Sequence, residues 1–287
     1  MDNHFSIDAL LPAEMAVKAE NAGVTKANLG FFRMLTLSIL AGAFIGMGAI
    51  FATTVTTGAS GMLPFGVTRF LAGFAFCLGL ILVVGAGAEL FTGNNLIVMA
   101  WADRKVTTGQ VLRNWGIVYL GNFIGSVATA VGMFLTRQYT FGEGSMGLNA
   151  LNIAQSKVQF DFVQAVMLGV FCNALVCLAV WLCLGARTAS DKILAIIFPI
   201  TAFVAAGFEH SVANMYFIPI GLLIKAGASP EFWAQIGKTP LDYAQLTWSN
   251  FFVINLLPVT IGNIIGGALM VGLVYWFVYL RPSWTGR

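Results

Sequence analysis

The chain has 287 residues, of which 58% are hydrophobic and only 9% are charged, whereas a soluble domain has about 25% charged residues. So few charges cannot cover a surface that faces water, and a soluble globular protein is therefore excluded. The net charge is only +3, and the sequence has no cluster of Lys and Arg of the kind that binds nucleic acid. The composition indicates a protein that lies in a lipid bilayer.

The first 29 residues precede the apolar stretches and predict a short amphipathic helix. Pro12 suits the first turn of this helix, and Gly23 is expected to end it. A helix on the membrane interface is the simpler interpretation, and a cytoplasmic plug or gate is the alternative. As a gate, the helix would loosen in acid, because protonation weakens the contacts of its carboxylates with basic loop residues such as Arg104, Lys105 or Lys192.

Six stretches with few or no charges follow. A transmembrane helix needs about 20 consecutive apolar residues, and each stretch is longer than this. A β-barrel is disfavoured because its strands would alternate apolar and polar residues. We therefore predict an all-α membrane protein with six transmembrane helices, within residues 34–68, 70–102, 114–136, 162–186, 193–224 and 243–280.

The distribution of Lys and Arg predicts the orientation of these helices. With the N-terminus inside, the inner segments hold ten Lys and Arg and the outer segments hold five. Positive residues favour the cytoplasmic side, so both termini are expected to be cytoplasmic. The six-span domain is expected over residues 30–281, with repeats at about 30–137 and 158–281, followed by a cytoplasmic tail at 282–287.

Two of the six spans have an acidic residue near the middle. Glu89 lies in the string Gly-Ala-Glu-Leu-Phe-Thr-Gly-Asn-Asn, and Glu209 lies in Gly-Phe-Glu-His-Ser-Val-Ala-Asn. Thr92 or Gly93 in the first string and Ser211 in the second are suited to begin a new helix. We therefore predict that both spans break near the membrane centre and restart as separate helices.

A second string occurs once in each half of the chain. Gly-Asn-x-x-Gly begins at Gly121 and again at Gly262, each time one span after a broken one. Each half then has three spans, and this odd number places the second half upside-down relative to the first. Inverted repeats with discontinuous helices are typical of transporters and channels, and the N-terminal end of a restarted helix attracts an anion.

His210 is the residue most strongly indicated as functional. It is the only histidine outside the N-terminal tail, and it lies beside Glu209 in the middle of a span. Ionisable groups inside a membrane are costly and mostly functional, so we expect His210 in the permeation path. Glu89 and Glu209 either bind the pore contents or accept structural hydrogen bonds, and the second role is favoured. No metal or other cofactor is predicted, and the four intramembrane cysteines are interpreted as packing residues.

These strings resemble the formate/nitrite transporter family. Ala-Ser-Asp-Lys at 189–192 and Pro-Val-Thr-Ile-Gly-Asn-Ile-Ile-Gly-Gly at 258–267 extend the resemblance, which covers essentially the whole chain. The segments Leu-Leu-Pro-Ala-Glu-Met-Ala and Ala-Ser-Pro-Glu-Phe-Trp are similar to the formate-channel branch. The resemblance implies an aquaporin-like fold and a pH-regulated homopentamer in the bacterial inner membrane. Each subunit would conduct small anions of weak acids, foremost formate, passively or with a proton, with nitrite or hydrosulfide as the alternative.

The resemblance also implies roles for single residues. His210 is expected at the pore centre with Thr92 across from it, Lys157 in the outer vestibule, and Glu209 as the acid that orients the site. Asn173 and Asn263 match polar pore-lining positions. The apolar constrictions match Leu80, Leu90, Phe91 and Phe203, with Phe76 and Val176 as further members. The N-terminal segment resembles the pH-responsive cytoplasmic helix of the family.

A remote alternative from another class is an intramembrane serine protease. Ser60 lies in a Gly-x-Ser-Gly string, and His210 would be its base. Pro64 follows closely and places Ser60 in the short loop between the first two spans. This hypothesis also leaves the two acidic strings unexplained.

Overall fold

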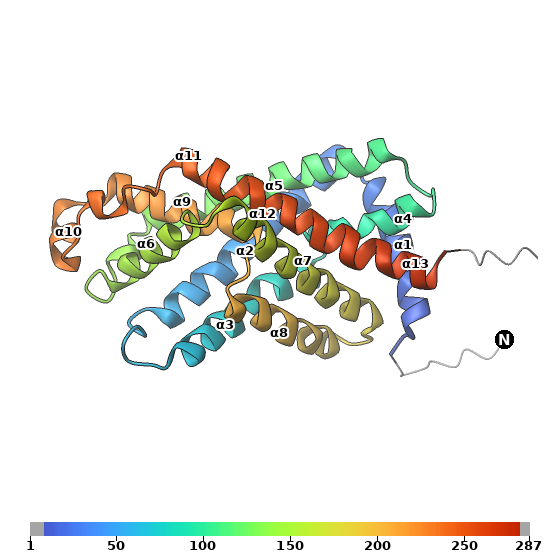
Figure 1. Ribbon diagram of the computed structural model, residues 1–287, viewed down its shortest axis with the longest axis horizontal. Helices are drawn as coiled ribbons and strands as arrows, with labels where there is room; N and C mark the ends of the chain where they lie inside the picture. Colours follow the sequence, from blue (N-terminus) through green and yellow to red (C-terminus); the bar gives the residue numbers. More distant parts are fainter. Residues whose placement is uncertain (1–8, 282–287) are drawn as a thin grey trace, which may run out of the picture.

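The computed structural model describes residues 9–281, and all regular secondary structure within that range is helical. Both ends of this range lie at one end of an elongated molecule, near α1 (Pro12–Ala27) and α13 (Val274–Tyr279) (Figure 1). At the other end lie α6 (Ser145–Lys157) and α10 (Pro230–Ile236). Residues 1–8 of the predicted N-terminal segment and the predicted tail, 282–287, lie outside the described residues.

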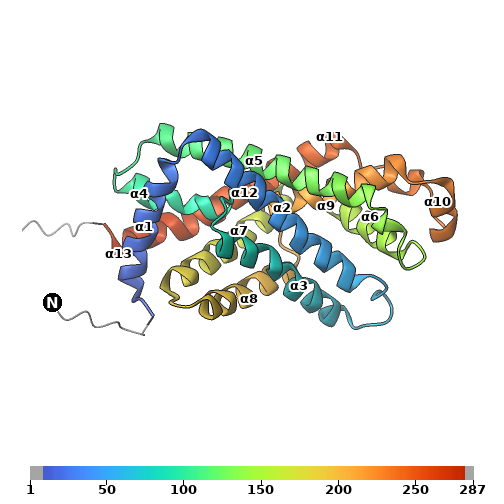
Figure 2. The same cartoon turned by 180° about the vertical axis from the view of Figure 1, so that it is seen from behind.

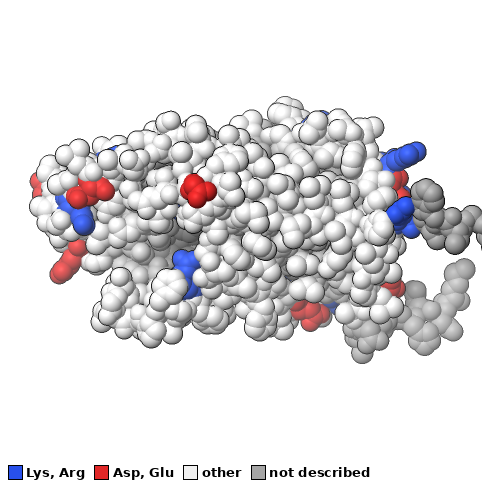
Figure 3. Space-filling model, in the orientation of Figure 1, with Lys and Arg blue, Asp and Glu red and all other residues white. Residues whose placement is uncertain are grey.

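Six helical segments are long and apolar enough to cross a membrane, as the composition predicts. They are α2 (Phe31–Thr56), α3 (Phe65–Ala86), α5 (Thr108–Leu135), α7 (Phe162–Gly185), α8 (Ala189–Ala206) and a last span over Pro240–Tyr279. Most charged side chains on the face shown lie towards the two ends of the molecule. Apart from an acidic and a basic patch left of the centre, most of the face between the ends is uncharged (Figure 3). Such a surface suits lipid or a neighbouring subunit rather than water.

The last span is composed of several short segments. It contains η3 (Pro240–Tyr243), α11 (Trp248–Asn250), η4 (Phe251–Leu256), α12 (Leu257–Ile264), η5 (Ile265–Leu273) and α13. Of these, η4 and η5 are π-helical, and π-helical turns occur mostly as local bulges in α-helices, often at functional sites. One further short helix, η2 (Gln138–Thr140), follows α5.

Two transmembrane segments are broken at the predicted strings. The chain leaves α3 at Gly87 with φ +70° and restarts as η1 (Gly93–Ile97) and α4 (Val98–Ala102). It leaves α8 at Gly207 with φ +81° and restarts as α9 (Ser211–Gly227). Glycine adopts this left-handed conformation without a steric penalty. Both new helices begin at residues predicted from the sequence.

The two broken segments pack against each other. In both views α3 and α8 lie side by side (Figure 2). A Cβ atom at Gly73 of α3 would lie only 2.6 Å from the carbonyl oxygen of Thr201 in α8. The breaks that follow these two helices are thereby brought to the middle of the molecule.

One expectation about the N-terminal helix is wrong. Gly23 does not end α1, which continues to Ala27. Gly23 is buried, and a Cβ atom there would lie 3.2 Å from the Cβ of Ala100 in α4. Its role is to allow close packing of α1 on the channel domain.

Glycines also allow α5 to approach α2. A Cβ atom at Gly125 would lie 2.0 Å from the carbonyl oxygen of Ile39, whereas a Cβ atom at Gly132 on the same helix would meet nothing within 4 Å. Small residues at helix interfaces in membranes let the two helix backbones approach each other this closely.

Gly125→Ala is expected to destabilise the protein by about 1–3 kcal/mol, because the clashing atom belongs to the backbone and overpacking is costly. Gly132→Ala is the matched control and is expected to leave stability unchanged or to raise it by up to about 1 kcal/mol, because alanine is the better helix former. Thermal unfolding of the detergent-solubilised protein measures both. Equal unfolding temperatures for the two variants would contradict the close packing.

Candidate functional site

Two cavities enter the six-span domain from opposite ends. The α6-side cavity has a volume of about 620 Å³, and its lining includes Arg69, Phe76, Lys157, Phe203, Glu209 and His210. The α1-side cavity has a volume of about 420 Å³, and its lining includes Lys26, Arg33, Leu80, Glu89 and Leu90. Both cavities contain cationic groups beside apolar side chains.

Apolar side chains form the floors of the two cavities. Phe76 and Phe203 line the α6-side cavity and pack edge to face, with ring centroids 5.8 Å apart. Leu80 and Leu90 line the α1-side cavity, and all four side chains are buried. Removing an anion from water without replacing its hydration costs several kcal/mol. Apolar side chains in this position therefore oppose the passage of a hydrated inorganic ion.

His210 lies at this barrier, where its two ring nitrogens have different partners. Nδ1 accepts a hydrogen bond of 3.1 Å from the backbone N–H of Ala213 and so caps α9. Since Nδ1 is the acceptor, the ring proton is assigned to Nε2, which donates to Thr92 Oγ1 at 2.9 Å. The ring also stacks on Phe203 at 6.0 Å. A proton on Nδ1 would break the cap, so the geometry favours the neutral imidazole.

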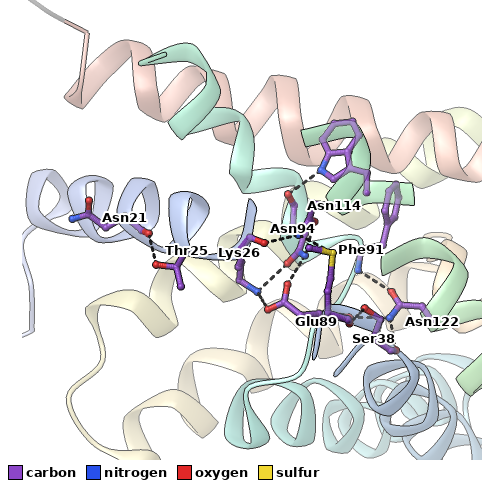
Figure 4. A network of polar contacts seen from close by, with 11 residues as sticks. Asn21, Thr25, Lys26, Ser38, Glu89, Phe91, Asn94, Asn114 and Asn122 are labelled. Atoms are coloured by element: carbon purple, nitrogen blue, oxygen red, sulfur yellow. Dashed lines mark hydrogen bonds and ion pairs between the residues drawn. The ribbon is translucent and has the colours of Figure 1, made fainter. Parts of the chain in front are cut away.

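A polar network surrounds the break on the α1 side (Figure 4). Lys26 Nζ donates to Glu89 Oε1 at 2.7 Å and to Asn94 Oδ1 at 3.0 Å. The Asn94 amide donates to Glu89 Oε2 and to Asn114 Oδ1, and the Asn114 amide donates to the Lys26 carbonyl. The asparagine partner of Glu89 agrees with the structural role favoured from the sequence, whereas Lys26 and Asn114 were not predicted.

The α6 side has an equivalent network. Lys157 Nζ donates to Glu209 Oε1 at 2.8 Å. The Asn214 amide donates to Glu209 Oε2 and to Asn255 Oδ1, and the Asn255 amide donates to the Lys157 carbonyl. One lysine, one glutamate and two asparagines therefore share four hydrogen bonds in each half, and this repetition agrees with the inverted repeat. The bond from Lys26 to Asn94 Oδ1 occurs only on the α1 side, and a bond from the Asn255 amide to Glu209 Oε2 occurs only on the α6 side.

Lys157 is held within this network. Its side chain is only 14% exposed, and its amine also lies 5.3 Å from the ring centroid of Phe217. Its bond to Glu209 is short, so the two charges largely neutralise each other outside the pair. The resemblance to the family implied that Lys157 lies in the outer vestibule, and Lys157 lines the α6-side cavity.

The two Gly-Asn-x-x-Gly strings bring asparagines to the breaks. Asn122 Oδ1 accepts from the Phe91 N–H and Asn263 Oδ1 accepts from the Ser211 N–H, each at 2.9 Å. Both Nδ2 groups donate to carbonyls beside the breaks. Asn173 is fully buried and donates to the Asn263 carbonyl at 2.7 Å. Asn173 and Asn263 therefore bind backbone groups at the breaks and in neighbouring helices, and neither residue lines the two cavities.

The repeat is broken at two pairs of equivalent positions. Gly42 corresponds to Asn173, and Ser126 corresponds to Gly267. A Cβ atom at Gly42 would lie 2.1 Å from the Asn122 carbonyl oxygen, and one at Gly267 would lie 2.3 Å from Asn173 Nδ2. The second half therefore has the larger residue, Asn173, where the first has Gly42, and the smaller residue, Gly267, where the first has Ser126. Each half remains closely packed.

The remaining constriction residues lie elsewhere. The Phe91 ring packs on Tyr119 at 4.8 Å and on Trp115 at 6.0 Å. It lines an apolar groove of about 740 Å³ between α5 and the last span, and not the two cavities. Val176 is buried and lines neither of the two cavities. The structure therefore brings together Phe76, Leu80, Leu90 and Phe203 with His210 and Thr92, and places Phe91 on another side.

The N-terminal helix α1 is fixed beside the α1-side cavity. Glu20 is buried and pairs with Lys105 at 2.5 Å, and Lys18 donates to the Leu184 carbonyl at 2.8 Å. Burial raises the pKa of Glu20, against the opposing effect of the hydrogen bond from Lys105. A raised pKa means that docked α1 holds this proton more tightly than free α1 does, so acidification favours docking. From the sequence, acid is expected to loosen α1, whereas protonation of Glu20 favours the docked position of α1.

Glu20→Gln is therefore expected to keep α1 docked when the α1-side solution is neutral, and to reduce the pH dependence of flux on that side. The amide resembles the protonated carboxyl, which is neutral, whereas the charge of the ionised carboxylate opposes burial. Flux through the full chain, with only the α1-side pH varied, measures the effect. Glu14→Gln removes the same charge from an exposed position of α1 and is the control. Identical pH profiles for wild type and Glu20→Gln would contradict the assignment.

Comparisons with known proteins agree with these features. The model of the family described as formate/nitrite transporter matches residues 13–277. The chain is 48% identical to the formate channel FocA of Escherichia coli K12 over 98% of both chains. It is 43% identical to the formate channel FocA of Haemophilus influenzae over 92% of this chain and 93% of that protein. A solved structure described as a pentameric formate channel with formate bound superposes with a TM-score of 0.82 at 45% identity, covering 88% of this chain and 98% of that one.

Proposed function

The chain belongs to the formate/nitrite transporter family, and on that premise we propose that it forms a homopentameric formate channel with one pore in each subunit. The protein is a multi-pass membrane protein of the bacterial inner membrane, and we place the α1 side in the cytoplasm. The observation that carries the proposal lies within one chain. Two cationic cavities enter from opposite ends, with apolar side chains between them. The α6-side cavity is lined by His210, which is hydrogen-bonded to Thr92, and the α1-side cavity is lined by Leu90, two residues before Thr92.

The geometry supports a path for a weak acid. A formate anion enters a cavity because the cationic groups there raise its local concentration. The apolar side chains oppose its passage as a hydrated anion, and a protonated acid crosses them at a lower cost in hydration. The Nε2–H of His210 and the Thr92 hydroxyl are the polar groups at the barrier, and they replace part of the lost hydration. The relatives are channels and transporters rather than enzymes, so the protease hypothesis for Ser60 is dropped.

Flux measurements in proteoliposomes test this function. Vesicles with the purified pentamer are expected to take up formate faster than empty vesicles, and chloride is expected not to pass the apolar barrier. Nitrite and hydrosulfide serve as competing substrates. Faster flux of nitrite or hydrosulfide than of formate would assign the protein to another branch of the family, and no flux of any of the three would reject the channel.

A further inference from the structure

Each cavity has one positive charge in excess. The charged side chains that line the α6-side cavity are Arg69, Lys157 and Glu209. Those that line the α1-side cavity are Lys26, Arg33 and Glu89. In both cavities the lysine amine lies within 2.8 Å of the glutamate carboxylate. The charges of each pair largely cancel beyond a few ångströms, and one arginine is left at each end.

The inverted repeat separates the lysines from the arginines. The offset that relates Lys26 to Lys157 relates Arg33 to Gln164, and the offset that relates Glu89 to Glu209 relates Arg69 to Ala189. The Lys–Glu pairs therefore belong to the shared scaffold of the two halves, because they recur together with their asparagine partners. The arginines occupy unrelated positions on α2 and α3, yet each supplies the same excess charge to its own cavity.

Arg69 is held in a defined place. Its Nε donates to the Ala205 carbonyl at 3.1 Å, and an Nη donates to the Val204 carbonyl. These carbonyls belong to the last turn of α8, whose final carbonyl groups lack partners within the helix. The guanidinium has five N–H donors, so three remain after these two bonds. Arg33 is exposed, and among residues 9–281 it has no carboxylate partner within 4.0 Å.

We propose that Arg69 and Arg33, rather than Lys157 and Lys26, are the residues that draw a carboxylate anion into the two cavities. An unpaired charge acts over about 8–10 Å at moderate ionic strength, whereas the field of a close ion pair falls off within a shorter distance. A guanidinium also matches the planar carboxylate with two parallel N–H donors. The inference rests on the proposed function, since it names the groups that a carboxylate meets first on each side.

The test measures initial formate uptake at low formate concentration in uniformly oriented vesicles, at about 0.01 M and about 0.15 M salt. At low salt, Arg69→Gln is expected to lower uptake from the α6 side by about three- to tenfold, and Arg33→Gln to do the same from the α1 side. At high salt both losses are expected to shrink. Neither variant should change the entry of formate from the opposite side, so initial uptake from that side is expected to stay nearly the same.

Matched controls remove one charge from the same end of the protein outside the cavities. Arg137→Gln serves the α6 side, and Arg104→Gln serves the α1 side; neither residue lines the two cavities. Arg69→Lys keeps the positive charge but lacks the two parallel N–H donors of the guanidinium. This variant is therefore expected to retain the salt dependence and to show weaker formate affinity. Arg69 binds the end of α8, so each Arg69 variant is first checked for correct folding by its elution as a pentamer. Arg33 is exposed, so its variant tests the proposal independently of folding.

Two results would overturn this inference. One is a loss in Arg33→Gln and Arg69→Gln no greater than in Arg104→Gln and Arg137→Gln. The other is a loss that is equal at both salt concentrations. Absence of formate uptake by the wild-type protein is a different result, and it would reject the proposed function itself.

Discussion

His210→Phe is expected to abolish formate flux and to lower the stability of the protein. The substitution removes the acceptor that caps α9 at the Ala213 N–H and the donor that reaches Thr92 Oγ1. Loss of an N-cap costs about 0.5–2 kcal/mol, and loss of the polar group leaves the barrier wholly apolar. Flux in proteoliposomes and thermal unfolding in detergent measure the two effects separately.

His210→Asn distinguishes these two roles of the side chain. Asparagine is a favourable N-cap residue, and its amide supplies both an acceptor and a donor but does not titrate. We expect this variant to retain the fold and a measurable flux, because neutral His210 already uses one acceptor and one donor. A loss of flux as complete as in His210→Phe, with the pentamer intact, would instead assign His210 the transfer of a proton.

Lys157→Met is expected to destabilise the protein by about 3–5 kcal/mol, since removal of one partner of a buried ion pair leaves the other charge uncompensated. Glu209 is 3% exposed and would lose its only cationic hydrogen-bond partner within the described residues. The variant also leaves the negative charge of Glu209 to cancel the excess positive charge of the cavity, so the accompanying loss of flux is expected to be larger at about 0.01 M than at about 0.15 M salt. Unfolding and flux at both salt concentrations measure this.

The double variant Lys157→Met with Glu209→Gln is the control for Lys157. It removes both charges and keeps a similar volume, so it is expected to recover part of the lost stability. The double variant also keeps the excess positive charge of the cavity, so a defect of this variant that is large at low salt and absent at high salt would contradict the structural role. It would support the charge-collecting role implied by the resemblance to the family.

Much of the fold follows from short strings in the sequence. The length and low charge of the apolar stretches predict the six spans, and the strings around Glu89 and Glu209 predict both breaks. The spans and the breaks can be predicted from local sequence. The length of an apolar stretch and the cost of removing charged groups from water determine them almost alone. The repeated Gly-Asn-x-x-Gly string is also visible in the sequence, and its asparagines, Asn122 and Asn263, accept hydrogen bonds from backbone N–H groups at the breaks.

The lysine partners could not be predicted in the same way. Lys26 lies on α1, and Lys157 lies at the end of α6, so both come from segments outside the predicted repeats. Their contacts depend on how distant segments pack. A further signal was present but unused: Asn114 lies eight residues before Asn122, and Asn255 lies eight residues before Asn263. The direction of the Phe91 ring likewise depends on Trp115 and Tyr119 of another helix.

The central pair of side chains has no symmetry, although the surrounding scaffold does. By the offset that relates the two breaks, Leu90 is the counterpart of His210, and Val212 is the counterpart of Thr92. A solute arriving through the α1-side cavity therefore meets a hydrocarbon side chain where one arriving through the α6-side cavity meets an imidazole. At equilibrium the two opposing fluxes must still be equal. Away from equilibrium, the sequence of free-energy barriers differs between the two directions, so half-saturating concentrations measured for export and for import need not coincide.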